Sequence, residues 1–271
     1  GSKMYVTLEP CNHYGKTPPC TNLFIKKKIS EVFYSIEDID RKVKGKSFNI
    51  LGSKNIIVKK GLLNKDVNNF YSIYFFNRKK KLPFVTGKIA TSKNNIIYST
   101  KSKRITDLHS DKLTHFLRYK NDSIMISYKT LNNDNPKLNC RLNGLKKFSP
   151  KRIILDNNLD TKKNSYIFNT ANKENTIIFY NSANKQKIIL FKKKGIQVIK
   201  SNLTKKSYFN LKLVLKKLYK IGVRNILVEA GDDLSGSFFK NNLFNEFYLF
   251  KSPKSLSKSD SYKDFNYFKH L

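Results

Sequence analysis

From residue 84 onward, short runs rich in β-branched side chains alternate with segments of mixed polarity, and this alternation is the feature that most constrains the fold. Six runs are predicted to be strands, at 84–90, 123–127, 152–156, 176–180, 196–199 and 225–229. The segment 107–118 predicts a helix, and a second helix is indicated where apolar side chains recur at Leu211, Val214, Leu215 and Leu218. Strands and helices that alternate along a chain require crossover connections, so the sequence predicts an α/β domain.

The first 80 residues predict a smaller α/β unit. Strands are expected at 4–8, 32–36 and 54–58, and helices at 21–29 and 63–77. A new unit is expected to start near Pro83, which divides the chain into a domain over 1–80 and a domain over 81–271. Two stretches rich in Lys and Asn, at 157–163 and 169–175, predict long solvated loops.

The net charge of +35 has two interpretations. Clustered Lys and Arg can bind a polyanion, which would make the chain a basic nucleic-acid-binding protein. However, the sequence has 47 Lys and 31 Asn but only 7 Arg, and Arg makes the bidentate contacts that nucleic-acid surfaces use. The lysines are also scattered through every segment. This pattern favours a compositional bias toward Lys and Asn over a nucleic-acid partner.

The sequence shows no feature of membrane insertion or secretion. No apolar run approaches the roughly 20 residues that span a bilayer, and no signal-peptide pattern opens the chain. Three cysteines are too few for a disulfide framework, so a reducing, cytoplasmic compartment is expected.

Two of these cysteines, Cys11 and Cys20, lie on one predicted loop. A Glu-Pro-Cys sequence follows the first predicted strand and ends at Cys11, and a Thr-Pro-Pro-Cys sequence opens the next helix at Cys20. Two thiolates on one loop can hold Zn²⁺ if two further ligands complete the tetrahedron. The pair is therefore either part of a zinc site or a pair of buried thiols.

These motifs resemble the zinc-dependent deaminases, and the wide cysteine spacing is similar to the deaminase half of the bifunctional riboflavin-biosynthesis deaminase–reductases. The resemblance implies a cytidine-deaminase-like α/β/α unit in which Cys11 and Cys20 bind zinc. In that family the third ligand and a proton-shuttling Glu belong to an upstream His-Ala-Glu motif, and no residue precedes Gly1 here. We therefore expect a unit that lacks the N-terminal part of the deaminase domain, with a partial zinc site whose third ligand is absent.

The resemblance continues after Pro83 through the reductase half of the same family, which has a dihydrofolate-reductase-like fold. The sequence Lys-Ile-Ala-Thr-Ser that starts at Lys88 is similar to the first reductase strand, which implies that Lys88 faces the reaction centre and Ala90 contacts the cofactor. The next matching stretch implies a substrate contact for Ser102 and a cofactor contact for Arg104, where the family commonly has Trp. Arg118, at the end of the following helix, matches a substrate-binding Arg.

The clearest match lies between Thr130 and Arg141 and resembles the family sequence Thr-x-x-x-Asp-x-Pro-x-Leu-x-x-Arg. It implies that Thr130 and Asp134 bind NADPH and that Leu138 and Arg141 bind the phosphoribosyl substrate. The chemistry agrees, because a guanidinium suits a phosphate monoester and the Pro fixes the loop that carries it. Asn157 lies where the family often has a cofactor-binding Ser.

The segment 225–236 predicts a strand, a Glu-Ala-Gly turn and the start of a helix, where free N–H groups attract anions. The family uses this turn for NADPH and its Glu for substrate, which implies substrate binding and a catalytic role for Glu229. The implied cofactor contacts are Gly231, Asp232, Asp233, Leu234, Ser235, Gly236 and Ser237.

The resemblance as a whole implies NADPH-dependent reduction of 5-amino-6-(5-phosphoribosylamino)uracil to its ribitylamino form, with Lys88 or Glu229 assisting ring opening or proton transfer. In the intact family this step is paired with zinc-dependent deamination of the diaminohydroxyphosphoribosylaminopyrimidine precursor. Assembly into homo-oligomers is also implied. Two alternatives stay open, a basic nucleic-acid-binding protein whose enzyme motifs are relics and an inactive regulatory or structural partner.

Overall fold

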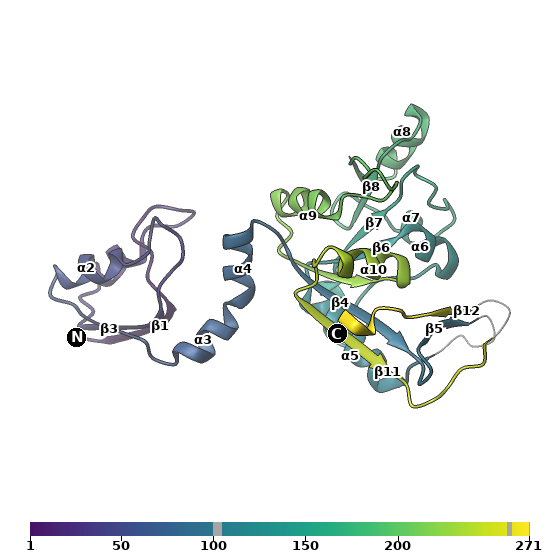
Figure 1. The fold of residues 1–271 in the computed structure, drawn as a ribbon. Helices are drawn as coiled ribbons and strands as arrows, with labels where there is room; N and C mark the ends of the chain where they lie inside the picture. The colour runs from purple at the N-terminus through teal and green to yellow at the C-terminus, as the bar shows by residue number, and fades with distance from the viewer. Residues whose placement is uncertain (100–104, 259–261, 271) are drawn as a thin grey trace. The chain divides into compact units, whose positions relative to one another are not determined.

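The computed structural model describes residues 1–99, 105–258 and 262–270, and contacts within the chain divide it into two units, Gly1–Lys81 and Leu82–Leu271. Figure 1 labels the helices and strands of both units. No helix in the described part of the chain is long and apolar enough to cross a membrane. Ser102 and Arg104, two of the predicted site residues, lie outside the described residues.

The first unit is a three-stranded parallel sheet in the order β1-β2-β3. Its strands are β1 (Lys3–Leu8), β2 (Glu31–Ile36) and β3 (Ile57–Lys60), and its helices are α1 (Cys20–Lys26), α2 (Lys46–Gly52), α3 (Asn64–Phe70) and α4 (Ser72–Lys80). Phe24 of α1 and Leu51 of α2 share a small apolar core with Val32 of β2. This arrangement of short parallel strands and helices is the α/β unit that the sequence predicts.

Three elements of the first unit differ from the prediction by more than a residue or two. The single helix expected over 63–77 is interrupted at Tyr71, where α3 ends and α4 begins. The third strand begins at Ile57 rather than at residue 54, because Asn55 has a positive φ of 58° and turns the chain first. The first helix ends at Lys26 rather than at residue 29, because Lys28 has a left-handed φ of 51° that a helix cannot include.

Helix α2 is not predicted from the sequence, and a buried carboxylate explains its position. Glu9, which is 3% exposed, accepts hydrogen bonds from the backbone N–H groups of Asp38, Gly45 and Ser47 at 3.3, 3.0 and 3.2 Å, and from Ser47 Oγ at 2.8 Å. A carboxylate at a helix N-terminus satisfies free N–H groups and complements the helix dipole. The Glu of the Glu-Pro-Cys sequence therefore fixes a helix that follows much later in the chain.

The second unit is built on a seven-stranded sheet in which every neighbouring pair is parallel. The order is β11-β4-β10-β6-β7-β8-β9, formed by β4 (Phe84–Thr91), β6 (Ser123–Ser127), β7 (Lys151–Leu155), β8 (Thr176–Tyr180), β9 (Gln197–Lys200), β10 (Asn225–Glu229) and β11 (Glu246–Lys251). The six strands predicted from the sequence are confirmed, and the edge strand β11 is additional.

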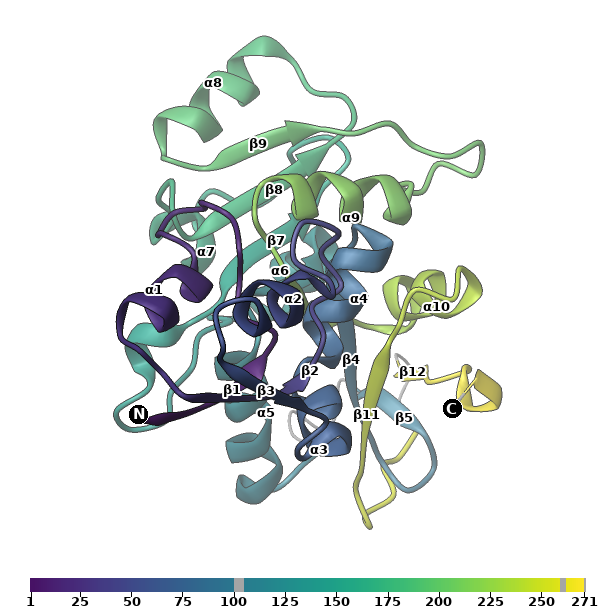
Figure 2. The same cartoon turned by 90° about the vertical axis from the view of Figure 1, so that its left-hand side faces the viewer.

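Helices cover both faces of this sheet (Figures 1 and 2). One apolar core contains side chains of α5 (Leu108–Lys120), α6 (Tyr128–Asp134), α7 (Tyr166–Asn169) and α8 (Lys185–Lys193), together with Ile124 and Ile126 of β6. The other core contains α9 (Leu211–Lys220), α10 (Asp232–Lys240) and Met125 of β6. Successive side chains of β6 thus enter opposite cores, as the pleat of a strand requires. The four predicted apolar positions of α9 are all buried.

A two-stranded antiparallel ribbon connects distant parts of the second unit. It is formed by β5 (Ile96–Ser99) and β12 (Tyr262–Asp264), and short 3-10 helices lie at Lys146–Phe148 and Phe268–His270. The sequence does not predict this ribbon, because each strand is too short to show a pattern and its partner lies near the opposite end of the unit. Phe265, which follows β12, is buried with Ile89 and Phe239.

Gly87 of β4 lies against two aromatic rings. A Cβ atom at this position would be 2.3 Å from the ring of Phe247 and 2.6 Å from the ring of Phe244. The centroids of these rings lie 4.9 and 4.8 Å from that of Phe239, so neighbouring rings restrict their movement. The absence of a side chain at Gly87 is therefore required for the packing of β11 beside β4.

We predict that Gly87→Ala lowers the free energy of unfolding by about 1–3 kcal/mol, because the added methyl group must displace packed rings. Urea denaturation followed by circular dichroism measures this change. Gly231→Ala is the matched control, since nothing lies within 4 Å of its Cβ position and its φ of −69° suits alanine. Equal stability of the two variants would contradict the packing argument.

Candidate functional site

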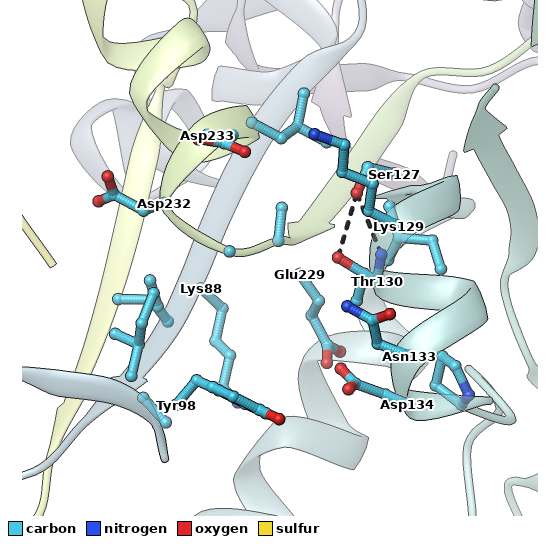
Figure 3. Close-up of a pocket in the computed structure, with 18 of the residues that line it drawn as sticks. Lys88, Tyr98, Ser127, Lys129, Thr130, Asn133, Asp134, Glu229, Asp232 and Asp233 are labelled. Carbon is cyan, nitrogen blue, oxygen red and sulfur yellow. Dashed lines mark hydrogen bonds between the residues drawn. The ribbon is translucent and has the colours of Figure 1, made fainter. Parts of the chain in front are cut away.

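A cavity of about 450 Å³ opens toward the carboxyl ends of β4, β10 and β6, which are neighbours in the sheet (Figure 3). Ligands of open parallel sheets bind outside the carboxyl ends of the strands, so this is the expected edge for a site. The polar side chains that line the cavity are Lys88, Tyr98, Arg118, Ser127, Lys129, Thr130, Asn133, Asp134, Glu229, Asp232, Asp233 and Lys263.

A bidentate ion pair forms part of the cavity wall. Arg118 Nε donates to Glu229 Oε1 at 2.7 Å, and Arg118 Nη2 donates to Glu229 Oε2 at 2.8 Å. The two side chains are only 11% and 14% exposed, so water screens their attraction weakly. Planar guanidinium and carboxylate groups match in this geometry. The pair connects the last turn of α5 to the last residue of β10.

Lys88 adds a third charge next to this pair. It is the register partner of Glu229 between the parallel strands β4 and β10, and its Nζ lies 5.1 Å from the centroid of the Phe250 ring. Burial lowers the pKa of Lys88 below its ordinary value, and the opposing charge of Glu229 does not restore it. Lys88 therefore gives up its proton more readily than an exposed lysine does.

Glu229 has the opposite tendency. Burial by itself raises the pKa of its carboxyl, but the Arg118 guanidinium, with a smaller contribution from Lys88, holds that pKa below its ordinary value. Glu229 is consequently ionised at neutral pH. At neutral pH the cavity thus contains the ionised carboxylate of Glu229 beside the ammonium group of Lys88, which can release its proton.

Thr130 is held at the cavity by a helix cap. Ser127, the last residue of β6, is the N-cap residue of α6, and its Oγ accepts a hydrogen bond from the Thr130 N–H at 3.3 Å. The two hydroxyl oxygens are 3.2 Å apart (Figure 3). Because Ser is a favoured N-cap residue, the strand-to-helix turn itself determines where the Thr130 side chain lies.

The structure brings most of the predicted reductase-site residues together. Those that line the cavity are Lys88, Ala90, Arg118, Thr130, Asp134, Leu138, Glu229, Gly231, Asp232, Asp233 and Leu234. They come from β4, α5, α6, the loop after α6, the end of β10, and Gly231 with the first turn of α10. Residues that are far apart in the sequence therefore surround one space.

Other predicted residues lie outside the cavity lining. Ser235 and Ser237 donate from their hydroxyl groups to the carbonyl oxygens of Ala230 and Asp233, at 3.1 and 2.9 Å. Gly236 faces the C-terminal segment, because a Cβ atom there would lie 2.1 Å from Tyr267 Oη. These three residues follow the first turn of α10, where backbone N–H groups are already engaged within the helix.

Two further predicted residues, Arg141 and Asn157, do not line the cavity. Arg141 is exposed, and its Nη1 donates to Asn139 Oδ1 at 3.2 Å. Asn157 follows β7, and its carbonyl oxygen accepts hydrogen bonds from the N–H groups of Asn181 and Ser182 at 2.9 and 3.0 Å. Direct cofactor or substrate contacts for these residues stay predictions.

Sequence reasoning missed several polar residues of the cavity, namely Tyr98, Ser127, Lys129, Asn133 and Lys263. Tyr98 and Lys263 are brought there by the ribbon of β5 and β12, where they are register partners. Lys129 and Asn133 belong to α6, the helix that also carries Thr130. Asn133 lies three residues after Thr130 and so shares its face of α6, but the sequence did not predict this helix.

The N-terminus of α10 has several features that bear on whether it can bind the phosphates of a dinucleotide. Gly231 is the N-cap residue and makes no side-chain cap, so the first N–H groups of this nine-residue helix lack an intrahelical acceptor. The space beside Gly231 is open. The carboxylates of Asp232 and Asp233 oppose an anion, although Asp232 also accepts a hydrogen bond from the Asn266 N–H at 3.2 Å, and three lysines line the same cavity. These groups fit an anionic cofactor such as NADPH.

The two cysteines of the first unit were tested for their fit to zinc. Cys11 Sγ and Cys20 Sγ are 3.5 Å apart, a separation that suits two thiolates on one ion. His13 follows in the same loop, and its buried Nδ1 has no hydrogen-bond partner. Among residues 1–99, 105–258 and 262–270, however, no group of three or more His, Cys, Asp or Glu side chains is placed to hold a metal. The described residues therefore do not complete a zinc site.

Comparisons with known proteins agree with this geometry. The family described as the RibD C-terminal domain matches residues 87–262. The chain is similar to the riboflavin biosynthesis protein RibD of Aquifex aeolicus, with 32% identity over 97% of this chain and 72% of the relative. It is also similar to the RibD protein of Buchnera aphidicola, with 34% identity over 94% and 71%.

Two solved structures resemble the model. The Thermotoga maritima diaminohydroxyphosphoribosylaminopyrimidine deaminase/5-amino-6-(5-phosphoribosylamino)uracil reductase is 27% identical with a TM-score of 0.78, and the match covers 96% of this chain and 69% of that one. Acinetobacter baumannii RibD gives a TM-score of 0.81 at 24% identity over 98% and 74% of the two chains, which supports the fold. A small N-terminal parallel sheet followed by a dihydrofolate-reductase-like domain is thereby confirmed.

We predict that Glu229→Gln lowers the free energy of unfolding at pH 7 by roughly 2–4 kcal/mol, because it leaves the Arg118 guanidinium without its counter-ion. A carboxyl with a depressed pKa stabilises the fold above its unfolded pKa, and this contribution is lost as the pH falls through the folded pKa. The difference between wild type and variant should therefore shrink below the ordinary glutamate value of 4.5. Urea denaturation at several pH values tests this, and a difference that does not change with pH would contradict it.

Proposed function

Since the chain belongs to the RibD family of riboflavin biosynthesis proteins, we propose that residues 82–271 reduce 5-amino-6-(5-phosphoribosylamino)uracil with NADPH. The observation that carries the proposal is the cavity in which Lys88, Arg118 and Glu229 meet at the carboxyl ends of neighbouring strands. This reduction is one of the two activities in the description of the similar Thermotoga maritima protein.

We assign substrate binding to the side of the cavity that holds the ion pair. The Glu229 carboxylate can accept further hydrogen bonds from a polar substrate, because each oxygen has more than one acceptor position. Arg118 directs its bonds to Glu229 and to the carbonyl oxygen of Asn139, so its role is to orient the carboxylate. Arg141 is exposed, bonds through Nη1 to the side chain of Asn139 and has other N–H groups without described partners, and it is the proposed phosphate ligand. Leu138 supplies an apolar wall.

We assign cofactor binding to other residues of the same cavity lining. They are Ala90, Thr130 and Asp134, together with the segment from Gly231 to Leu234. Bound NADPH supplies the hydride for the reduction. The protein's part is to hold the diphosphate near the free N–H groups of α10 and to keep the nicotinamide beside the substrate.

Hydride addition at C1 of the opened sugar consumes one proton at the neighbouring nitrogen. Glu229 is a poor source of this proton, because Arg118 keeps its carboxyl ionised. Lys88 is the better source, since burial lowers the pKa of its ammonium group toward the working pH. Of the two catalytic candidates, Lys88 is thus proposed as the proton donor and Glu229 as the group that orients substrate.

Oxidation of NADPH by the purified chain tests the proposed function. We expect a loss of the nicotinamide absorbance that requires 5-amino-6-(5-phosphoribosylamino)uracil and saturates with it. Omission of the substrate is the control for background oxidation. A folded chain that neither binds NADPH nor oxidises it would overturn the proposal and favour a chain without turnover.

Lys88 as proton donor predicts a particular pH dependence. An ammonium acid is active while protonated, so kcat should fall as the pH rises through a value below the ordinary lysine pKa of 10.5. Lys88→Ala should lower kcat by about 100-fold or more and remove this alkaline limb. Stopped-flow measurement of NADPH oxidation between pH 6 and 10 tests both effects. Wild-type turnover in Lys88→Ala would exclude Lys88 as the donor.

A further inference from the structure

The backbone carbonyl oxygen of Asn139 is a hydrogen-bond acceptor shared by two side chains beside the ion pair. The backbone oxygen of Asn139 accepts a hydrogen bond from Arg118 Nη1 at 3.2 Å, and His115 Nδ1 lies 3.1 Å from the same oxygen. The side-chain oxygen of Asn139 accepts from Arg141 Nη1 at 3.2 Å. One residue of the loop after α6 therefore contacts Arg118 of the cavity lining, Arg141 and a histidine of α5.

The protonation state of His115 follows from this contact. A carbonyl oxygen only accepts hydrogen bonds, so Nδ1 must carry the hydrogen. The side chain is 8% exposed, and burial together with the charges of Arg118 and Arg141 lowers the pKa of its imidazole. His115 is thus a neutral donor at physiological pH, and it supports Asn139 without adding a third positive charge.

The backbone before Asn139 needs such support. Leu138 has a φ of 53°, a left-handed conformation that is costly for a residue with a branched side chain. It is nevertheless 3% exposed and lines the cavity. A strained residue persists only when its surroundings determine its conformation, and the two hydrogen bonds to the Asn139 carbonyl oxygen, one residue later, provide that constraint.

We propose that His115 is a positioning residue of the reductase site. By donating its Nδ1 hydrogen to Asn139 beside Arg118, it fixes the turn that carries Leu138 and holds the guanidinium flat against Glu229. His115 does not line the cavity and makes none of the proposed ligand contacts, so it acts only through these neighbours. This inference rests on the proposed function for its effect on turnover, whereas its effect on Arg118 is independent of the reaction.

Substitutions at position 115 can distinguish the effect of the hydrogen-bond donor from the effect of the side-chain volume. Asn places an amide nitrogen where Nδ1 lies, so His115→Asn should retain the bond to Asn139. His115→Leu keeps comparable bulk without a donor, and His115→Gln places its amide at the position of Nε2, so both should lose the bond. His109 lies exposed in the first turn of the same helix, and His109→Leu is the matched control.

The primary readout is proton exchange at Arg118 Nε–H, observed by ¹⁵N NMR on the wild-type and variant chains and assigned with Arg118→Lys. In His115→Leu and His115→Gln we expect exchange to accelerate about tenfold, as loss of one hydrogen bond allows. His115→Asn and His109→Leu should stay within twofold of wild type. Unchanged exchange in the folded Leu and Gln variants would overturn the proposal, and so would equal acceleration in the Asn variant.

Steady-state kinetics give the second readout. In His115→Leu the KM for the phosphoribosylaminouracil should rise about tenfold while the KM for NADPH changes less than twofold, and His115→Asn should restore the substrate KM. A general loss of stability would not produce this split below the melting temperature. If the wild type shows no reduction but Arg118 exchange responds as expected, the proposed function fails and the positioning role stands. Normal substrate KM in an active His115→Leu enzyme would overturn the role in the reaction.

Discussion

The ion pair between Arg118 and Glu229 is the interaction on which the cavity of the second unit depends. It connects the last turn of α5 to the carboxyl end of the central strand β10, and both side chains are largely removed from water. A buried charge without its partner is strongly destabilising, so each residue requires the other. Because β4 lies beside β10 in register, Lys88 is brought to the same pair and its pKa is lowered by the same burial.

The mixture of charges in the cavity differs from the net charge of the chain. The net charge is +35, yet the cavity contains the carboxylates of Asp134, Glu229, Asp232 and Asp233 beside a few cations. Most of the lysines lie outside this cavity, scattered along the sequence. A ligand in the cavity lies close to both positive and negative groups. Because salt screens distant charges, these near groups act on the ligand more strongly than the net charge of the chain does.

Several elements were predictable because their signals are local. The buried positions of α9 follow from helical spacing, and the six predicted strands follow from short β-branched runs. Of the motif between residues 130 and 141, Thr130, Asp134 and Leu138 line one cavity, whereas Arg141 does not. Other elements depend on distant partners. Helix α2 requires the carboxylate of Glu9, and the ribbon of β5 and β12 requires pairing between the two ends of the unit.

The sequence by itself determined the α/β class, the order of the strands along the chain and the motifs that relate it to riboflavin biosynthesis proteins, because these depend on residue type and spacing. Only the tertiary structure decided which of the motif residues share one space. Ser235, Gly236 and Ser237 make contacts outside the cavity lining. Arg118 and His115 contact the same carbonyl oxygen of Asn139. Spacing along the chain specifies neither the direction of a side chain nor the hydrogen bonds that orient it, since both depend on packing between distant segments.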